Sequence, residues 1–159
     1  MTGDSVKVTA QIDVPVAAAF AAFTEDINLW WRAGPRYRAG GRWPSALYLE
    51  PRLGGRLFEE IAAPAPIVRE IGAITAWDPP AHLALTWCAA SFAPGETTIV
   101  EVWFAASGTG TRVTLEHRGW ASIPADAPVR HGRTPAAFIA DTGRWWADLF
   151  ASLRAHAAR

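Results

Sequence analysis

Two ionisable residues, Glu59 and His117, occupy predicted strand positions whose neighbours on the same face are apolar. The two-residue period of a strand places His117 with Val113 and Leu115, and it places Glu59 with Leu57. A carboxylate or imidazole on an inner face either shifts its pKa or pairs with another group. In a curled sheet these strands can face each other across a cavity. There the pair would orient a ligand's polar group, or act as base and acid.

Each of these residues also has a structural interpretation. His117 would then hydrogen-bond a tryptophan N–H or a backbone carbonyl, and Glu59 would form a salt bridge with a nearby arginine. We therefore assign no catalytic residue, and keep Glu59 and His117 as the two candidates.

Tryptophan is unusually frequent, with nine in 159 residues. An indole brings a large contact area and an N–H that needs a partner when buried. Such rings suit the wall of a cavity, although they could equally pack against one another in a core. With Glu59 and His117, the predicted ligand-binding wall consists of Trp30, Trp31, Leu57, Trp77, Leu85, Trp87, Val102, Leu115, Phe138, Thr142, Trp145 and Leu149.

Alternating apolar residues and turn signals predict seven strands, the last six of them as an antiparallel meander. Two short helices follow the first strand. The first begins at Pro15 with Asp13 in capping range, and the second ends at Trp31. The predicted strands are residues 5–13, 46–51, 56–61, 69–77, 82–88, 97–104 and 111–120.

A long amphipathic helix begins at Pro135, with Thr134 as its N-cap. Of the adjacent Trp145 and Trp146, only one can face squarely inward, and Trp145 fits the apolar stripe better. The helix must bury that stripe, and an antiparallel sheet offers one apolar face. We predict a single α+β domain over 1–159, a curved seven-stranded antiparallel sheet around the C-terminal helix, with a pocket where the two diverge.

Four arginines stand in the predicted loop 32–45 without an acid among them: Arg32, Arg36, Arg38 and Arg42. They would clamp an anionic ligand at the entrance or simply be solvated, and the second is expected.

The sequence lacks the signatures of several classes of function. Net charge is zero, which argues against nucleic acid or an anionic membrane as partner. The histidines do not cluster at metal spacing, and no phosphate-binding or nucleophile motif occurs. We expect no cofactor and no metal. Cys88 is the lone cysteine, and no signal-peptide or membrane-spanning stretch is present, so a cytoplasmic location is expected.

Several motifs occur in a characteristic order: Phe20-x-x-Phe23-Thr24, Trp30-Trp31, 49–56 (LEPRLGGR), Phe58-Glu59, 72–87 (GAITAWDPPAHLALTW) and 110–120 (GTRVTLEHRGW). From about residue 5 to residue 157 the chain resembles the SRPBCC (START-like) superfamily, and within it the branch named after the heat-shock chaperone ATPase activator homologues. The resemblance implies a helix-grip fold with a cavity between sheet and long helix. It also implies ligands such as lipids, polyketides or hormones, and in a minority of relatives cyclisation, dehydration or hydrolysis.

Three functions follow from this sequence. The leading hypothesis is a carrier, sensor or sequestering protein for a small apolar or aromatic molecule. The alternative is a cofactor-free cyclase, dehydratase or hydrolase using His117 and Glu59. The third is an interaction module, a homodimer or chaperone partner, with an outer apolar patch including Trp103 and Ile99. The co-chaperones of this branch carry an additional N-terminal domain, whereas this chain starts directly at its first strand, so we do not expect chaperone activation.

Overall fold

The computed structural model describes residues 4–159, so the first three residues of the predicted domain lie outside the described part. Seven antiparallel strands form one sheet in the order β1-β7-β6-β5-β4-β3-β2. The predicted meander is confirmed, and β1 adds to it beside β7. The strands are β1 (Val6–Ile12), β2 (Ser45–Leu49), β3 (Arg56–Ile61), β4 (Ile67–Asp78), β5 (His82–Trp87), β6 (Thr98–Ser107) and β7 (Gly110–Arg118).

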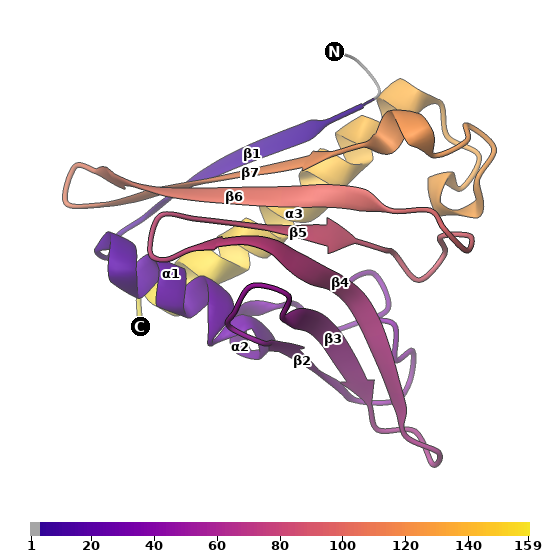
Figure 1. Cartoon of the computed structure of the whole chain (residues 1–159), viewed down its shortest axis with the longest axis horizontal. Helices are drawn as coiled ribbons and strands as arrows, with labels where there is room; N and C mark the ends of the chain where they lie inside the picture. Colours follow the sequence, from indigo (N-terminus) through magenta and orange to yellow (C-terminus); the bar gives the residue numbers. More distant parts are fainter. Residues whose placement is uncertain (1–3) are drawn as a thin grey trace.

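The sheet curls at β4, which pairs with β3 on one edge and with β5 on the other (Figure 1). The strands on its two sides run in different directions. Its pairing shifts register once against β3 and once against β5, and such bulges bend a strand. Gly72 lies at the bend, where a Cβ atom would come within 1.7 Å of the Thr86 carbonyl oxygen. Only glycine allows the two strands to approach this closely.

The helices are α1 (Val16–Thr24), α2 (Ile27–Trp30) and α3 (Pro135–Ala157), with two short 3₁₀ turns, η1 (Trp120–Ser122) and η2 (Pro128–Arg130), before α3. Thr134 caps α3 as predicted, since its Oγ1 accepts from the Ala137 N–H. The predicted cap of α1 is wrong. Pro15 occupies the N-cap position, and no side chain caps this helix.

Helix α3 crosses one face of the sheet, which we call the inner face (Figure 1). The strand faces predicted to be apolar are the buried ones, including Leu57 with Glu59 on β3 and Leu115 with His117 on β7. The assignment of the two helical tryptophans is wrong. Trp146 is 1% exposed within the core, whereas Trp145 is only partly buried. These features make the α+β helix-grip arrangement that the sequence predicts.

Candidate functional site

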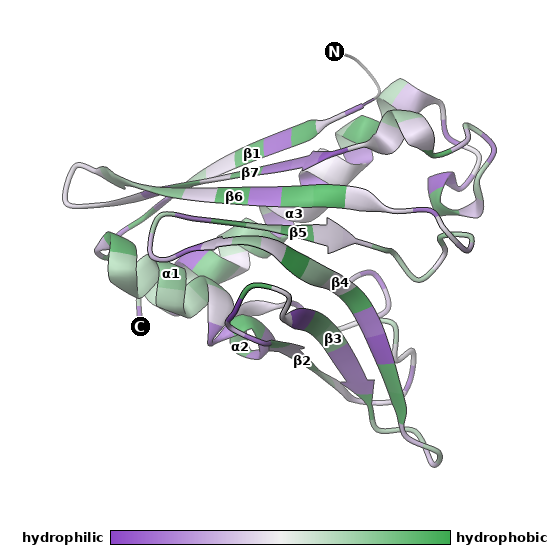
Figure 2. Cartoon of the chain, in the orientation of Figure 1, coloured by the Kyte–Doolittle hydropathy of each residue, from purple (hydrophilic) through white to green (hydrophobic). Residues whose placement is uncertain are grey.

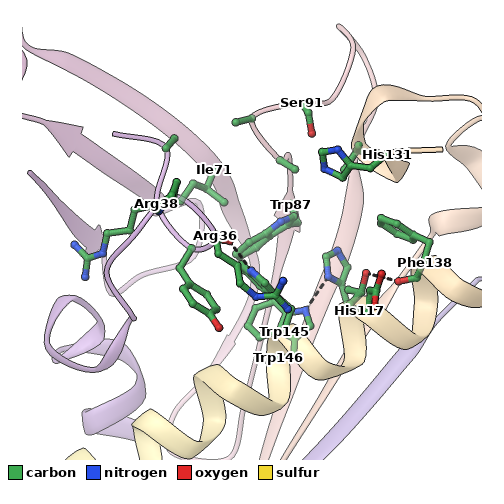
Figure 3. Close-up of a pocket in the computed structure, with 18 of the residues that line it drawn as sticks. Arg36, Arg38, Ile71, Trp87, Ser91, His117, His131, Phe138, Trp145 and Trp146 are labelled. Atoms are coloured by element: carbon green, nitrogen blue, oxygen red, sulfur yellow. Dashed lines mark hydrogen bonds between the residues drawn. The ribbon is translucent and has the colours of Figure 1, made fainter. Parts of the chain in front are cut away.

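A cavity of about 430 Å³ lies between the inner face of the sheet and the N-terminal half of α3. Residues 31–39 form one wall, and the segment that contains η1 and η2 contributes another. Figure 3 shows Arg38 and Ile71 on one side of this cavity, with His117 and Phe138 on the other. The cavity therefore lies beside the N-terminal half of α3.

The predicted wall residues divide into two groups. Those that line the cavity are Trp31, Glu59, Trp87, His117, Phe138, Thr142 and Trp145. The others do not line it: Trp30, Leu57, Trp77, Leu85, Val102, Leu115 and Leu149. Most of this second group is fully buried in the hydrophobic core, while Trp77 packs edge-on against Phe20. The strand period predicts the face of a residue but not its distance from the helix crossing.

Four indoles form one continuous cluster along the cavity. Trp31 lies with its ring centroid 5.6 Å from Trp145 and 5.8 Å from Trp146. Trp87 lies 5.4 Å from Trp146, and it also approaches Trp31 at 6.0 Å. These edge-on and tilted contacts stabilise the rings against one another. The same rings line the empty space, so core packing and cavity wall are combined in one cluster.

His117 is held by a chain of hydrogen bonds, and Figure 3 shows the one that joins it to Trp146. Its Nδ1 accepts from the Trp146 indole N–H at 3.1 Å, and an indole nitrogen can only donate. The proton of the neutral ring is therefore on Nε2, which donates to Thr98 Oγ1 at 2.7 Å. Thr98 in turn donates to the Trp87 carbonyl oxygen. This is the structural interpretation of His117, with a tryptophan N–H as partner.

Burial lowers the pKa of His117 to about 3, because the apolar surroundings disfavour the charged ring. The side chain is only 2% exposed. With both nitrogens engaged and the ring neutral at pH 7, His117 is poorly suited to exchange protons with a ligand.

Glu59 is also 2% exposed, but no salt bridge of the predicted kind joins it to an arginine among residues 4–159. Within residues 4–159, its only hydrogen-bond donor is the Ala39 backbone N–H, at 3.2 and 3.1 Å from the two carboxylate oxygens. Arg38 lies nearby, yet its guanidinium donates to the Asn28 side chain and to four backbone carbonyls, those of Asn28, Trp31, Arg32 and Ser45. Burial lowers the pKa of Arg38, an effect that the charge of Glu59 partly opposes.

The arginine loop is attached to α3 more firmly than a solvated loop would be. The Trp145 indole donates to the Arg36 carbonyl at 2.8 Å, and the Tyr37 ring stacks on Trp145. Tyr37 also donates to the Asp148 carboxylate, whose backbone carbonyl accepts from Arg32. Arg36 and Arg38 line the cavity. Arg32 and Arg42 are exposed and do not line it, and Arg42 stacks over Trp43. The loop is thus a cavity wall fixed by its backbone.

The wall before α3 is fixed by a buried arginine. Arg130 is 2% exposed and donates to the carbonyls of Trp120, Ile123 and Pro124, while its guanidinium lies over the Phe138 ring. Its interactions hold Trp120 against the cavity. An irregular segment has no period, so this arrangement leaves no signal in the sequence.

Sequence reasoning missed several lining residues: Ile71, Arg69, Trp120, Val129, His131 and Trp146. Two of them carried a usable signal. Arg69 lies opposite Glu59 in the β3–β4 register, and Trp120 closes a motif that the sequence displays. Val129 and His131 lie in the irregular segment and carried none.

The outer face of the sheet differs from the predicted apolar patch. Ile99 is exposed, but Trp103 is partly buried beside the His82 ring, at 5.8 Å between centroids. Around them runs a network of charges that joins His82 and Arg118 through Glu101. The prominent exposed apolar side chains lie mostly elsewhere: Leu29, Tyr48, Leu53, Ile67 and Val68.

Within the described residues, no cluster of potential metal ligands is found. None of the helices over 4–159 has the length and apolar character required to cross a membrane.

Comparison with known proteins agrees with this architecture. A protein of Mesorhizobium loti shares 21% identity and a TM-score of 0.62, with 94% of this chain and 93% of that chain covered. A Nitrosomonas europaea protein shares 15% identity and a TM-score of 0.66, over 98% and 95% of the two chains. An HSP90 activator from Plasmodium falciparum shares 17% identity and a TM-score of 0.64, over 96% and 94%. Likeness at such identities establishes the fold alone.

The fold is that of the helix-grip, START-like class. Residues 13–155 match the family described as Activator of Hsp90 ATPase homolog 1-like protein, and the chain belongs to this family. No curated protein matches its sequence.

Proposed function

We propose that this protein binds a small, largely apolar molecule of one or two rings in the cavity beside α3. The observation that supports this most directly is a space of about 430 Å³ next to four clustered indoles. That volume lies in the usual range for small-molecule sites, which are mostly apolar with a few polar groups. A carrier, sensor or sequestering role fits such a site.

Binding is a better interpretation than proton-transfer catalysis because of the state of His117. Its neutral ring supports the wall through Trp146 and Thr98 instead of presenting a free nitrogen. Glu59 lacks a second titratable partner joined to it by a hydrogen bond within residues 4–159. A chaperone-related role rests on the family description and on the fold of the Plasmodium falciparum HSP90 activator.

We also propose that the protein is a single domain, that it is located in the cytoplasm and that it has no nucleic-acid partner. Cys88 is a free thiol, which suits a reducing compartment.

The test is to fill the cavity. Thr142 lines it from α3, so Thr142→Phe should occupy the space that a guest needs. Ala140 on the same helix is exposed, and Ala140→Phe is the matched control. Calorimetric titration of the wild-type protein with indole and naphthalene should show saturable binding. We expect Thr142→Phe to weaken this binding about tenfold or more, and Ala140→Phe to leave it unchanged. Equal affinities of the two variants, or no saturable binding by the wild type, would contradict the proposal.

A further inference from the structure

One side of the cavity holds two opposite charges that are direct neighbours but do not form an ion pair. Glu59 on β3 and Arg69 on β4 are partners in the antiparallel register, so their side chains leave the sheet on the same face. Both line the cavity. Figure 2 shows hydrophilic segments on both β3 and β4. Among the salt bridges of residues 4–159, none joins them.

Each of the two side chains turns instead to a separate backbone group. The carboxylate oxygens of Glu59 share the single N–H of Ala39, and Arg69 Nη2 donates to the Cys88 carbonyl at 2.8 Å. A carboxylate offers about four acceptor positions and a guanidinium five N–H donors. In the described chain no further hydrogen bond reaches either group. Acceptor capacity on Glu59 and donors on Arg69 therefore remain unused beside the cavity.

Unused hydrogen-bonding capacity is costly where solvent is scarce, as it is around Glu59, which is buried, and to a lesser degree around Arg69, which is half-buried. Burial lowers the pKa of Arg69, and the charge of Glu59 opposes this only in part. Glu59 itself has almost no contact with bulk solvent. Buried charges are normally satisfied by several hydrogen bonds, and a bound group that supplied them would be favoured. Arg38 cannot take this part, because its N–H groups are committed to Asn28 and to carbonyl oxygens.

We propose that the guest carries, at one end of its apolar body, a neutral group in which a hydrogen-bond donor adjoins an acceptor. A carboxamide, or a hydroxyl next to a carbonyl, has this form. Its N–H or O–H would donate to Glu59, and its carbonyl oxygen would accept from Arg69, while the body contacts the indole cluster. A carboxylate guest would satisfy Arg69 but meet the negative charge of Glu59, and a ketone would supply Glu59 with no donor beyond the Ala39 N–H. The inference rests on the proposed function, because it requires an occupied cavity.

Binding affinities measured with the wild-type protein distinguish these head groups without any substitution. We suggest calorimetric titration with naphthalene, 2-acetylnaphthalene, 2-naphthoate and 2-naphthamide, which share one apolar body. We expect 2-naphthamide to bind about tenfold or more tightly than each of the other three, since it alone both donates and accepts. Equal affinities across the series, or tighter binding of naphthoate or the ketone, would overturn the head-group assignment and leave the cavity function standing. Absence of binding by all four would remove both.

A matched pair of variants tests whether Glu59 causes the preference for 2-naphthamide. Glu59→Gln preserves shape but removes the negative charge, so the preference for 2-naphthamide over 2-naphthoate should fall to about twofold or reverse. Glu60→Gln is the control, because Glu60 is the next residue on β3 and lies exposed on the outer face. A preference in folded Glu59→Gln equal to that of the control would refute the assignment. If Glu59→Gln does not fold by circular dichroism, the wild-type series remains decisive.

Discussion

Two histidines on opposite faces of the same sheet have opposite ionisation behaviour. His117 on β7 lies on the inner face, where burial lowers its pKa to about 3. His82 on β5 lies on the outer face between the carboxylates of Asp78 and Glu101, at 3.1 and 2.5 Å. Burial by itself would lower the pKa of His82, but these two carboxylates outweigh it and raise the pKa.

The contrast shows how the sheet separates two kinds of polar interaction. The outer face, which solvent reaches, uses charges that compensate one another, as when Glu101 also accepts from Arg118 at 2.7 Å. The inner face has a relay of neutral hydrogen bonds through Trp146, His117 and Thr98. An additional charge on the inner face would have to be desolvated with few partners available. This is the physical reason to expect an uncharged guest.

The strongest test of the contrast is His117→Ala. The substitution leaves the Trp146 indole N–H without its acceptor, deprives Thr98 of its donor and opens a void in the core. Together these losses should lower the free energy of unfolding by about 3 kcal/mol. Denaturant unfolding measures the change. Arg112→Ala on the exposed face of β7 is the control and should cost less than about 0.5 kcal/mol. Equal losses in the two variants would mean that the relay contributes nothing to stability.

The next largest expected effect is a loss of stability at acidic pH. The folded-state pKa of His117 lies below the value of 6.5 expected for the unfolded chain, so the unfolded state binds the proton more readily. Stability contributed by the neutral ring is therefore present above pH 6.5 and lost as pH falls toward 3. At pH 5 the loss should be about 2 kcal/mol. It is measured as the difference in unfolding free energy between pH 7 and pH 5.

The variant His117→Gln is the control for this acid effect, because glutamine is not protonated between pH 5 and pH 7. In His117→Gln the difference in stability between pH 7 and pH 5 should shrink by about 2 kcal/mol relative to the wild type. An unchanged difference would show that carboxylates elsewhere, and not this ring, dominate the acid response. A wild-type His117 ring that titrates near pH 6.5 by NMR would contradict the assigned neutral state.

The sequence predicted the elements and faces well because they depend on local periodicity. His117 and Glu59 were both placed on the inner face from the two-residue alternation, and the N-cap Thr134 from its position before Pro135. The prediction of the α1 cap failed because the helix begins after Pro15, which takes the N-cap position and leaves Asp13 outside it.

The site was predicted only in part, since a cavity depends on where elements cross. Leu85 and Trp87 share a strand face, yet only Trp87 reaches beyond the helix crossing to line the space. Trp146 was misplaced because its burial follows from the rotation of α3, which the acceptor on His117 helps to fix. Such long-range contacts leave no mark in a single sequence. The divergence of Glu59 from Arg69 likewise depends on Ala39 and Cys88, which belong to other segments.

The smallest expected effect concerns the outer histidine, and its sign is opposite. Because the folded-state pKa of His82 is raised, its charged form adds stability that is fully present below pH 6.5 and is lost as pH rises through the folded-state pKa. His82→Gln should therefore reduce stability at pH 6 by at most about 1 kcal/mol, and by less at pH 9, since its partners are near solvent. Urea unfolding at the two pH values measures this. A cost independent of pH would mean that His82 acts through neutral hydrogen bonds, and the two faces would then differ in burial but not in charge.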